Sequence, residues 1–234
     1  MIEWSRFSEL VVLTGAGVSV ASGLGTYRGK GGLWEKDGIA EEATLECLAT
    51  DPWRSWQFFL PLLQQAARAQ PNPAHRALAL LEERFAGRFL LVTQNVDGLH
   101  TAAGSRQVAE IHGNITRRRC VSALCKLEPF QDLTLPSSLP LCPECGSPLR
   151  PDIVLFGEQL PLDECHTVKR ALRTVDLFLA VGTSGTVHPA ASYVSWAKYA
   201  GATTIELNPE TSDLFDHSYQ KKAELVLPEL VANL

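Results

Sequence analysis

Residues 10–17 read Leu-Val-Val-Leu-Thr-Gly-Ala-Gly, an apolar run that ends in a glycine-rich turn. Such a run is typical of a strand buried on both faces of a parallel sheet. Glycines after the strand let the backbone approach a pyrophosphate, and the next helix N-terminus offers free N–H groups. The third glycine of the usual dinucleotide fingerprint is missing, because Val20 stands there. The stretch favours nucleotide binding, and a tight turn without a functional role is the alternative.

Apolar strands and amphipathic helices alternate along the rest of the chain. Strands are predicted at residues 89–93, 108–111, 153–156, 177–181 and 203–207. Helical patterning covers residues 40–70, 75–86, 162–174 and 189–200, whereas the Gly- and Ser-rich residues 18–32 look like an extended loop. This alternation predicts a Rossmann-like α/β fold, with a parallel sheet wrapped by helices.

Polar motifs recur directly after the predicted strands. They occupy residues 14–17, 94–97, 182–184 and 208–210. Ligands of open α/β sheets bind at the carboxyl ends of the strands, so we expect the four motifs to converge there.

Four of the six cysteines form two pairs, Cys120-x4-Cys125 and Cys142-x2-Cys145, with sixteen residues between the pairs. Four thiolates at such spacings suit a tetrahedral Zn²⁺ that holds shape and has no open position for chemistry. Unrelated free thiols are the alternative. The other two cysteines, Cys47 and Cys165, are expected in the core.

Composition narrows the function classes. The net charge of -5 does not suggest a general nucleic-acid binder, and the basic run Arg117–Arg119 is interpreted as a solvated edge. We expect no sequence-specific nucleic-acid partner and no membrane partner, since no stretch of eighteen apolar residues occurs. No secretory signal is visible, and paired cysteines then fit a reducing, cytoplasmic location.

Several polar side chains could act on a nucleotide. Arg28 could neutralise phosphate, although a surface arginine is an equal alternative. The side chains of Gln94, Asn95 and Asp97 could hold ribose hydroxyls or a carboxamide, or they could simply cap the next helix. His112 could serve as a general base, although a lone histidine is more often structural.

Taken together, these motifs resemble the sirtuin family of NAD-dependent protein deacylases. The resemblance covers almost the whole chain in family order. It rests on Gly15-Ala16-Gly17-Val18-Ser19, Ser22-Gly23, Tyr27-Arg28-Gly29, Gly31-Gly32-Leu33-Trp34, Thr93 to His100, His112-Gly113-Asn114, the four cysteines, Pro151 to Glu158, Gly182-Thr183-Ser184 and Asn208-Pro209-Glu210.

The resemblance implies a reaction. The carbonyl oxygen of an acyl-lysine attacks C1′ of the nicotinamide ribose of NAD, and nicotinamide leaves. His112 then acts as general base on the ribose hydroxyls, which gives free lysine and 2′-O-acyl-ADP-ribose. Residues 154–157 would pair with the extended backbone of the acyl-lysine protein or peptide.

The resemblance also implies a set of site residues. The catalytic residues would be His112 and Asn95. The residues that bind NAD would be Gly15, Ala16, Gly17, Ser19, Ser22, Gly23, Thr26, Tyr27, Arg28, Trp34, Gln94, Asn95, Val96, Asp97, Gly182, Thr183, Ser184, Asn208, Pro209, Glu210 and Ala223. The substrate-binding residues would be Val154, Leu155, Phe156, Gly157, Phe59 and Leu62. A structural zinc ion would be held by Cys120, Cys125, Cys142 and Cys145.

We expect a discontinuous domain organisation. Residues 1–38, 74–116 and 150–234 would form the Rossmann-like NAD-binding domain. Residues 39–73 would form the helical part of a small domain, and residues 117–149 would form an inserted zinc-binding module.

One departure from the family bears on the acyl group. Thr26 and the Gly31–Trp34 stretch resemble the class III branch, which often carries a Tyr-x-x-Arg pair that binds acidic acyl groups. The corresponding stretch here is Phe59-Leu60-Pro61-Leu62, which has neither the hydroxyl nor the guanidinium. A buried carboxylate without a cation would cost several kcal/mol. The sequence therefore predicts a preference for neutral acyl groups.

Two other functions stay open. One is a mono-ADP-ribosyltransferase or NAD hydrolase on the same scaffold. The other is a non-catalytic module that senses NAD or ADP-ribose. The protein substrate and the oligomeric state do not follow from the sequence.

Overall fold

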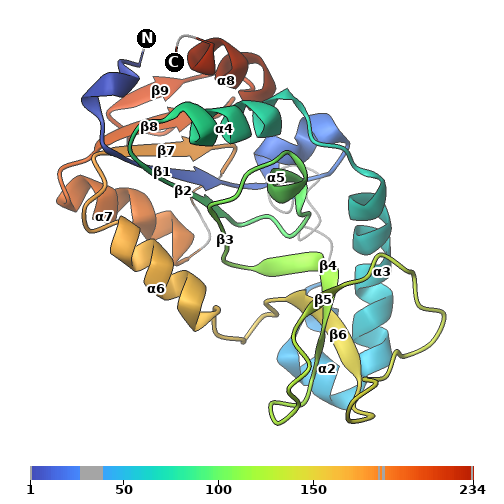
Figure 1. Ribbon diagram of the computed structural model, residues 1–234. Coiled ribbons are helices and arrows are strands. Elements are labelled where there is room, and N and C mark those ends of the chain that lie inside the picture. The colour runs from blue at the N-terminus through green and yellow to red at the C-terminus, as the bar shows by residue number, and fades with distance from the viewer. Residues whose placement is uncertain (1, 27–38, 184, 186–187, 233) are drawn as a thin grey trace.

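A parallel sheet of six strands forms the centre of the fold, which we describe from a computed structural model covering residues 2–26, 39–183, 185, 188–232 and 234 (Figure 1). The strand order is β3-β2-β1-β7-β8-β9, and each neighbouring pair is parallel. The strands are β1 (Glu9–Thr14), β2 (Arg88–Thr93), β3 (Val108–Glu110), β7 (Leu177–Val181), β8 (Thr203–Leu207) and β9 (His217–Tyr219). The chain moves outward on one side through β2 and β3 and on the other through β8 and β9. The order therefore reverses between β1 and β7, which is where a Rossmann-like sheet binds its ligand.

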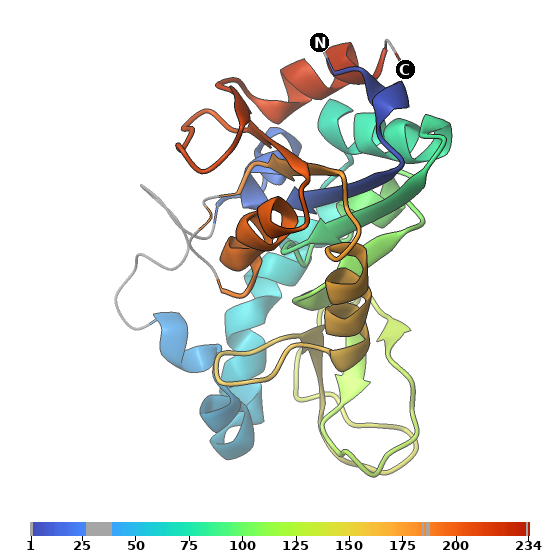
Figure 2. The same ribbon diagram turned by 90° about the vertical axis from the view of Figure 1, so that its left-hand side faces the viewer.

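Helices cover both faces of this sheet. One face carries α4 (Pro73–Arg84) and α8 (Ala223–Val231), and the other carries α6 (Leu162–Ala171) and α7 (Tyr193–Tyr199) (Figures 1 and 2).

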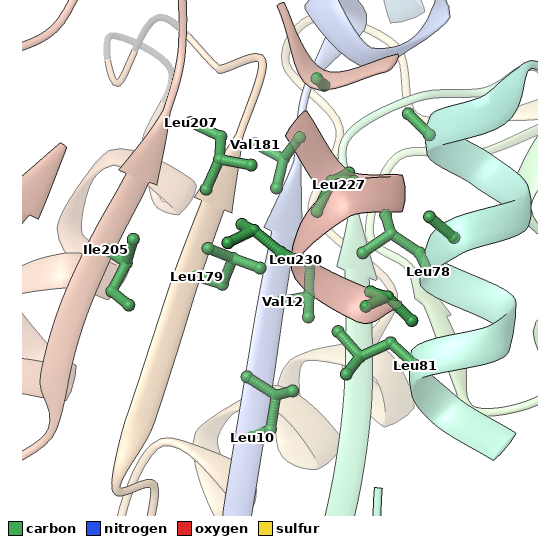
Figure 3. Close-up of a cluster of buried hydrophobic side chains, with 14 of the residues drawn as sticks. Leu10, Val12, Leu78, Leu81, Leu179, Val181, Ile205, Leu207, Leu227 and Leu230 are labelled. Atoms are coloured by element: carbon green, nitrogen blue, oxygen red, sulfur yellow. The ribbon is translucent and has the colours of Figure 1, made fainter. Parts of the chain in front are cut away.

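Side chains of each strand alternate between the two faces. In β1, Leu10 and Val12 pack toward α4 and α8, where Figure 3 shows them with Leu78 and Leu227. Their neighbours Val11 and Leu13 are buried against α6 and α7. The continuous apolar run of β1 is thus explained by burial on both sides.

A smaller part of the fold is built from two insertions (Figure 1). Three helices, α1 (Ile39–Glu42), α2 (Leu45–Thr50) and α3 (Pro52–Arg68), lie between β1 and β2 in the sequence. A small antiparallel sheet, in the order β5-β4-β6, lies between β3 and α6 and contains β4 (Gly113–Cys120), β5 (Phe130–Gln131) and β6 (Leu149–Ile153). The two insertions share an apolar core that includes Phe59, Leu63, Ile115 and Leu155.

Trp56 of α3 holds the insertions together. Its side chain is 1% exposed, and its indole N–H donates to the Leu149 carbonyl at 2.7 Å. The Arg118 guanidinium lies over the ring at 5.3 Å and also donates to the Thr134 carbonyl and forms an ion pair with Asp132. A cation over an aromatic face is a favourable contact.

The predicted solvated edge at Arg117–Arg119 is therefore wrong for Arg118, which is buried. Its positive charge is accommodated inside by the Trp56 ring, the Thr134 carbonyl and Asp132. Of its neighbours, Arg117 forms ion pairs with two acidic side chains, and Arg119 is exposed.

The strand predicted at 153–156 is wrong in its position, because β6 covers Leu149–Ile153 and pairs antiparallel with β4. The remaining differences from the sequence prediction concern short elements. Residues Ala16–Ser22 form a 3-10 helix, so the predicted extended loop is wrong there. The sequence did not reveal several short elements, which include β5, β9, the 3-10 turn Trp4–Arg6 and helix α8. The helix predicted at 189–200 is divided into a 3-10 turn at Ala190–Ser192 and α7. A further short helix, α5 (Leu99–Ala102), follows the Gln94–Asp97 motif. The exact domain boundaries stay predictions.

Among the described residues, no helix combines the length and the apolar character that crossing a membrane requires.

Candidate active site at the carboxyl edge of the sheet

The turns after β1 and β7 touch each other through their backbones. The Gly17 N–H donates to the Gly182 carbonyl at 2.9 Å. A Cβ atom at Gly15 or Gly17 would lie 2.8 or 2.7 Å from that same carbonyl oxygen, closer than real contacts allow. These glycines are therefore needed for the close approach of two turns at the switch point of the sheet, besides any role toward a phosphate.

The polar motifs after the strands are joined by hydrogen bonds. The Gln94 side-chain amide donates to Thr183 Oγ1 at 3.0 Å, and the Asn208 amide donates to the Thr183 carbonyl at 3.2 Å. The Asn95 amide donates to the Gly15 carbonyl at 3.1 Å. All four predicted motifs thus meet at one edge of the sheet.

The side-chain oxygen of Asn95 is buried and has no hydrogen-bond partner among the residues that the structure describes. Leaving a buried acceptor unpaired costs about 1–3 kcal/mol. A ligand that offers a hydroxyl or amide donor here would remove that cost. The position therefore fits a ligand such as a ribose or a carboxamide.

A buried polar chain runs beneath this edge. Ser19 Oγ donates to Asp97 Oδ2 at 2.7 Å and lies 3.4 Å from His75 Nε2. The His75 ring lies 4.8 Å from the His100 ring, and His100 Nε2 lies 2.9 Å from Thr14 Oγ1. Burial lowers the pKa of His75 to about 4, and it lowers the pKa of His100 well below its ordinary value. Both rings are neutral at pH 7, and both belong to the buried polar chain beneath the edge.

Asp97 connects the motif after β2 to Ser19 and to α5. Its Oδ1 accepts the N–H of Leu99, the first residue of α5, at 2.9 Å, while its Oδ2 accepts from Ser19. Burial raises the pKa of Asp97, and these two hydrogen bonds act in the opposite direction. The carboxylate is thus held rigidly at the edge of the site.

His112 follows β3 and is half-buried. Its Nδ1 lies 2.9 Å from the Gln94 carbonyl oxygen. Because a carbonyl only accepts, Nδ1 carries the proton and Nε2 keeps the lone pair of a base. Burial lowers the pKa of His112, partly offset by the Gln94 bond, so the ring is in its basic form at pH 7.

The predicted substrate segment, residues 154–157, is tied to the same histidine. The Val154 N–H donates to the His112 carbonyl at 2.9 Å. On the other side, the Phe156 N–H donates to the Ala43 carbonyl at 2.8 Å. The Phe156 side chain is 46% exposed, whereas Leu155 points into the core.

Other predicted residues have less direct positions. Phe59 and Val96 are buried in the core of the small part, and Leu62 is half-buried beside it. Pro209 and Glu210 are exposed after β8. The Ala223 side chain is buried at the start of α8, so only its backbone could face a ligand.

The exit from the 3-10 helix holds three more predicted residues. Gly23 ends the helix with a left-handed φ of 84°. Ser22 Oγ accepts from the Asn72 side-chain amide at 3.0 Å, and Thr26 is half-buried. Ala16 is the first residue of the helix. Four predicted residues lie outside the described part of the chain: Tyr27, Arg28, Trp34 and Ser184.

Comparison with known proteins shows the family. A family model described as the Sir2 family matches residues 15–189. The chain belongs to the Sir2 family. It is 44% identical over 226 residues to a protein named NAD-dependent protein deacylase from Aquifex aeolicus, covering 95% of this chain and 93% of that protein. The sirtuin resemblance is thereby confirmed.

Solved structures of Sir2 proteins share the fold. A Sir2 homolog in complex with NAD matches with a TM-score of 0.89 at 40% identity, over 98% of this chain and 90% of the other. A Sir2 protein with a deacetylated p53 peptide and 3′-O-acetyl ADP-ribose matches with a TM-score of 0.85 at 30% identity, over 98% and 95% of the two chains.

The four paired cysteines of this Sir2 protein form one cluster. The Sγ atoms of Cys120 and Cys145 lie 3.5 Å apart, those of Cys125 and Cys142 lie 3.6 Å apart, and all four lie within 4.8 Å of one another. Tetrahedral zinc with Zn–S bonds of about 2.3 Å needs sulfur atoms about 3.8 Å apart. The cluster fits a structural zinc site, as predicted. Cys47 is buried as expected, while Cys165 is only partly buried.

Sequence reasoning missed the support beneath the Sir2 site. The side-chain amide of Asn72, between two stretches of helical patterning, donates to the Val18 carbonyl at 2.8 Å. It also caps α4 in a capping box with His75. The Asn-x-x-His spacing directly before a helical pattern is a signal that could have revealed it.

We expect Cys142→Ser to lose bound zinc, because a closed four-thiolate site lacks a spare ligand. Zinc content should fall well below one ion per chain in a metal assay, and β4 and β6 should lose their fixed pairing. Cys47→Ser, the matched control outside the cluster, should keep its zinc. Full zinc content in Cys142→Ser would contradict the assignment.

Proposed function

We propose that this Sir2 protein removes acyl groups from lysine side chains of proteins or peptides, with NAD as co-substrate. One water molecule is consumed, and the products are free lysine, nicotinamide and 2′-O-acyl-ADP-ribose. The observation that carries the proposal is the neutral His112, whose Nε2 lone pair is left free by the bond between Nδ1 and the Gln94 carbonyl. This base lies at the edge where the loops of the sheet converge.

NAD would lie across the carboxyl ends of β1, β2, β7 and β8. When bound, it supplies an electrophilic ribose carbon and a leaving nicotinamide. The unpaired Asn95 oxygen supports this placement, since it can accept from a hydroxyl or carboxamide. The residues predicted for this role from the sequence are proposed for it here, including those outside the described part of the chain.

His112 would take a proton from a ribose hydroxyl through Nε2. Its Nδ1–H bond to Gln94 holds the ring in the required tautomer throughout. Residues 154–157 would align the acyl-lysine peptide by strand pairing, and the exposed Phe156 would cover it. Asn95 would orient the ribose from the opposite side.

The acyl pocket is proposed to prefer neutral groups. Phe59 is buried and Leu62 is half-buried. Because both side chains are uncharged, neither offers a cation for an acidic acyl group. A malonyl or succinyl carboxylate placed there would stay unpaired. Acetyl and other neutral acyl groups carry no such desolvation cost.

Zinc bound by the cysteine cluster would hold the small sheet in shape and take no part in the chemistry. Reduced thiolates are needed for that role. We therefore place the protein in a reducing compartment, most simply the cytoplasm. The oligomeric state is left open.

The decisive experiment compares His112→Ala with the parent protein on an acetyl-lysine peptide and NAD. We expect acetyl-peptide turnover to fall by at least about 100-fold, because general-base catalysis contributes about that much. The fold, followed by circular dichroism, should be unchanged. His166→Ala is the matched control, since His166 is exposed on α6.

Three outcomes separate the candidate functions. Unchanged turnover in His112→Ala would overturn the base assignment. Nicotinamide release by the parent protein without any acyl peptide would favour the NAD hydrolase. Binding of NAD without turnover of any acyl peptide would favour the sensing module.

The pH dependence of kcat/KM should follow His112. The base is active when deprotonated, and burial lowers its pKa below its ordinary value of about 6.5. Activity should therefore be fully present at pH 7 and be lost only as the pH falls below about 6.5. An acid limb centred above this value would contradict the assignment; pH–rate profiles on the acetyl peptide provide the measurement.

Acyl preference can be measured with acetyl-, butyryl- and succinyl-lysine peptides of one sequence. We expect kcat/KM for the succinyl peptide to be at least about 100-fold lower, because an unpaired buried carboxylate costs several kcal/mol. Leu62→Arg should raise succinyl turnover relative to acetyl turnover, while Leu62→Met, of similar bulk without charge, should not. Faster removal of succinyl than of acetyl by the parent protein would refute the preference.

A further inference from the structure

Residues 154–158 form a sharply turned segment after β6. The Glu158 N–H donates to the Leu155 carbonyl at 3.0 Å and closes a turn. Gly157 inside this turn has a φ of +83°, a conformation that side-chain-bearing residues rarely adopt. The turn projects Phe156 and Gly157 outward, where both are exposed.

Arg150 lies behind the turn and is 4% exposed. Its Nη1 and Nη2 donate to the two carboxylate oxygens of Glu158 at 3.1 and 2.8 Å. The same guanidinium also donates to the carbonyls of Pro151 and Ile153. Each of the three guanidinium nitrogens therefore donates a hydrogen bond to a residue at most eight positions further along the chain.

Glu158 completes the arrangement from the other end of the turn. Its Oε2 accepts the Leu155 N–H at 3.0 Å in addition to the bond from Arg150. Burial opposes ionisation of Glu158, but the hydrogen bonds from Arg150 and Leu155 outweigh it and keep its pKa below the ordinary value. The pair thus stays charged on both sides at neutral pH.

A buried ion pair is poor evidence for stability, because desolvation offsets much of the attraction. What this pair does determine is which main-chain groups point outward. It uses the Ile153 carbonyl and the Leu155 N–H on one side of the segment. The Val154 and Phe156 N–H groups are used by His112 and Ala43 on the other.

Three main-chain groups of residues 154–157 have no hydrogen-bond partner within the described ranges: the Val154 carbonyl, the Gly157 N–H and the Gly157 carbonyl. They include a donor and acceptors, as pairing with an extended peptide backbone requires.

We infer that Arg150 and Glu158 are positioning residues that hold segment 154–157 in the conformation that pairs with the backbone of an acyl-lysine peptide. The inference rests on the proposed function and names the residues that set its affinity for the peptide. Neither side chain touches the reacting atoms. The pair acts through the backbone, so it should matter only for substrates that have residues on both sides of the acyl-lysine.

The test uses Arg150→Lys, which keeps the charge and loses the fork, and Glu158→Gln, which keeps the shape and loses the charge. Each is assayed on an eleven-residue acetyl-lysine peptide and on an isolated acetyl-lysine amide without flanking residues. KM for the peptide should rise at least tenfold, while KM for the isolated amide and the Kd for NAD change less than about twofold. Arg106→Lys is the matched control, because Arg106 is exposed and pairs with Glu82 at 3.8 Å on another side of the molecule.

Equal losses on the two substrates would show a general structural effect and overturn the inference, and so would unchanged peptide KM in both variants. Binding of a fluorescent acetyl-lysine peptide, followed by anisotropy, separates this from the proposed function. If the parent protein binds the peptide without turnover, the proposed function fails. The ratio of the peptide Kd of each variant to that of the parent protein then still decides the role of Arg150 and Glu158. If the parent protein binds no peptide, both fail.

Discussion

The turns after β1 and β7 pass each other at backbone contact distance, and glycine is the residue that permits this approach. With the Gly17 N–H bonded to the Gly182 carbonyl, a methyl group at Gly15 or Gly17 would collide with the opposite turn. The contact lies where the strand order reverses, so it brings the ends of both halves of the sheet together. The bonds from Gln94 and Asn208 to Thr183 extend the same contact toward β2 and β8. The convergence of the polar loops thus depends on three glycines, Gly15, Gly17 and Gly182.

The insertions reach this edge through a second set of contacts. Trp56 fixes α3 to the Leu149 carbonyl, at the start of β6, and Arg118 of β4 covers its ring. Cys120 ends β4, and Cys142 packs with Leu149. The cysteine cluster is therefore connected through two paired strands to Gly113 and Ile153, which adjoin His112 and residues 154–157. This connection gives a zinc ion a physical influence on the site without any part in the chemistry.

Much of the fold could be predicted because burial on both faces leaves a plain apolar run, as in Val11 and Leu179. The three-residue strand His217–Tyr219 has no such run, and it exists because it pairs with β8. Helix α8 contains Pro228, which hid it from pattern reasoning. Arg118 was misjudged, since a basic run reveals nothing about an aromatic ring sixty-two residues away in sequence. The candidate base was predictable as a residue type, but the Gln94 carbonyl that sets its tautomer is a long-range backbone contact.

His112 joins the two parts of the site through different atoms. Its ring is held by a backbone carbonyl at the end of β2, and its own carbonyl accepts the N–H of Val154. The position of the His112 ring relative to Val154 is therefore determined by one residue and its two hydrogen bonds. Movement of the small part relative to the sheet would strain one of these bonds or carry the ring with it. The proposed reaction requires such coupling, because the ribose hydroxyl at Nε2 and the acyl-lysine aligned by residues 154–157 would have to meet in one geometry.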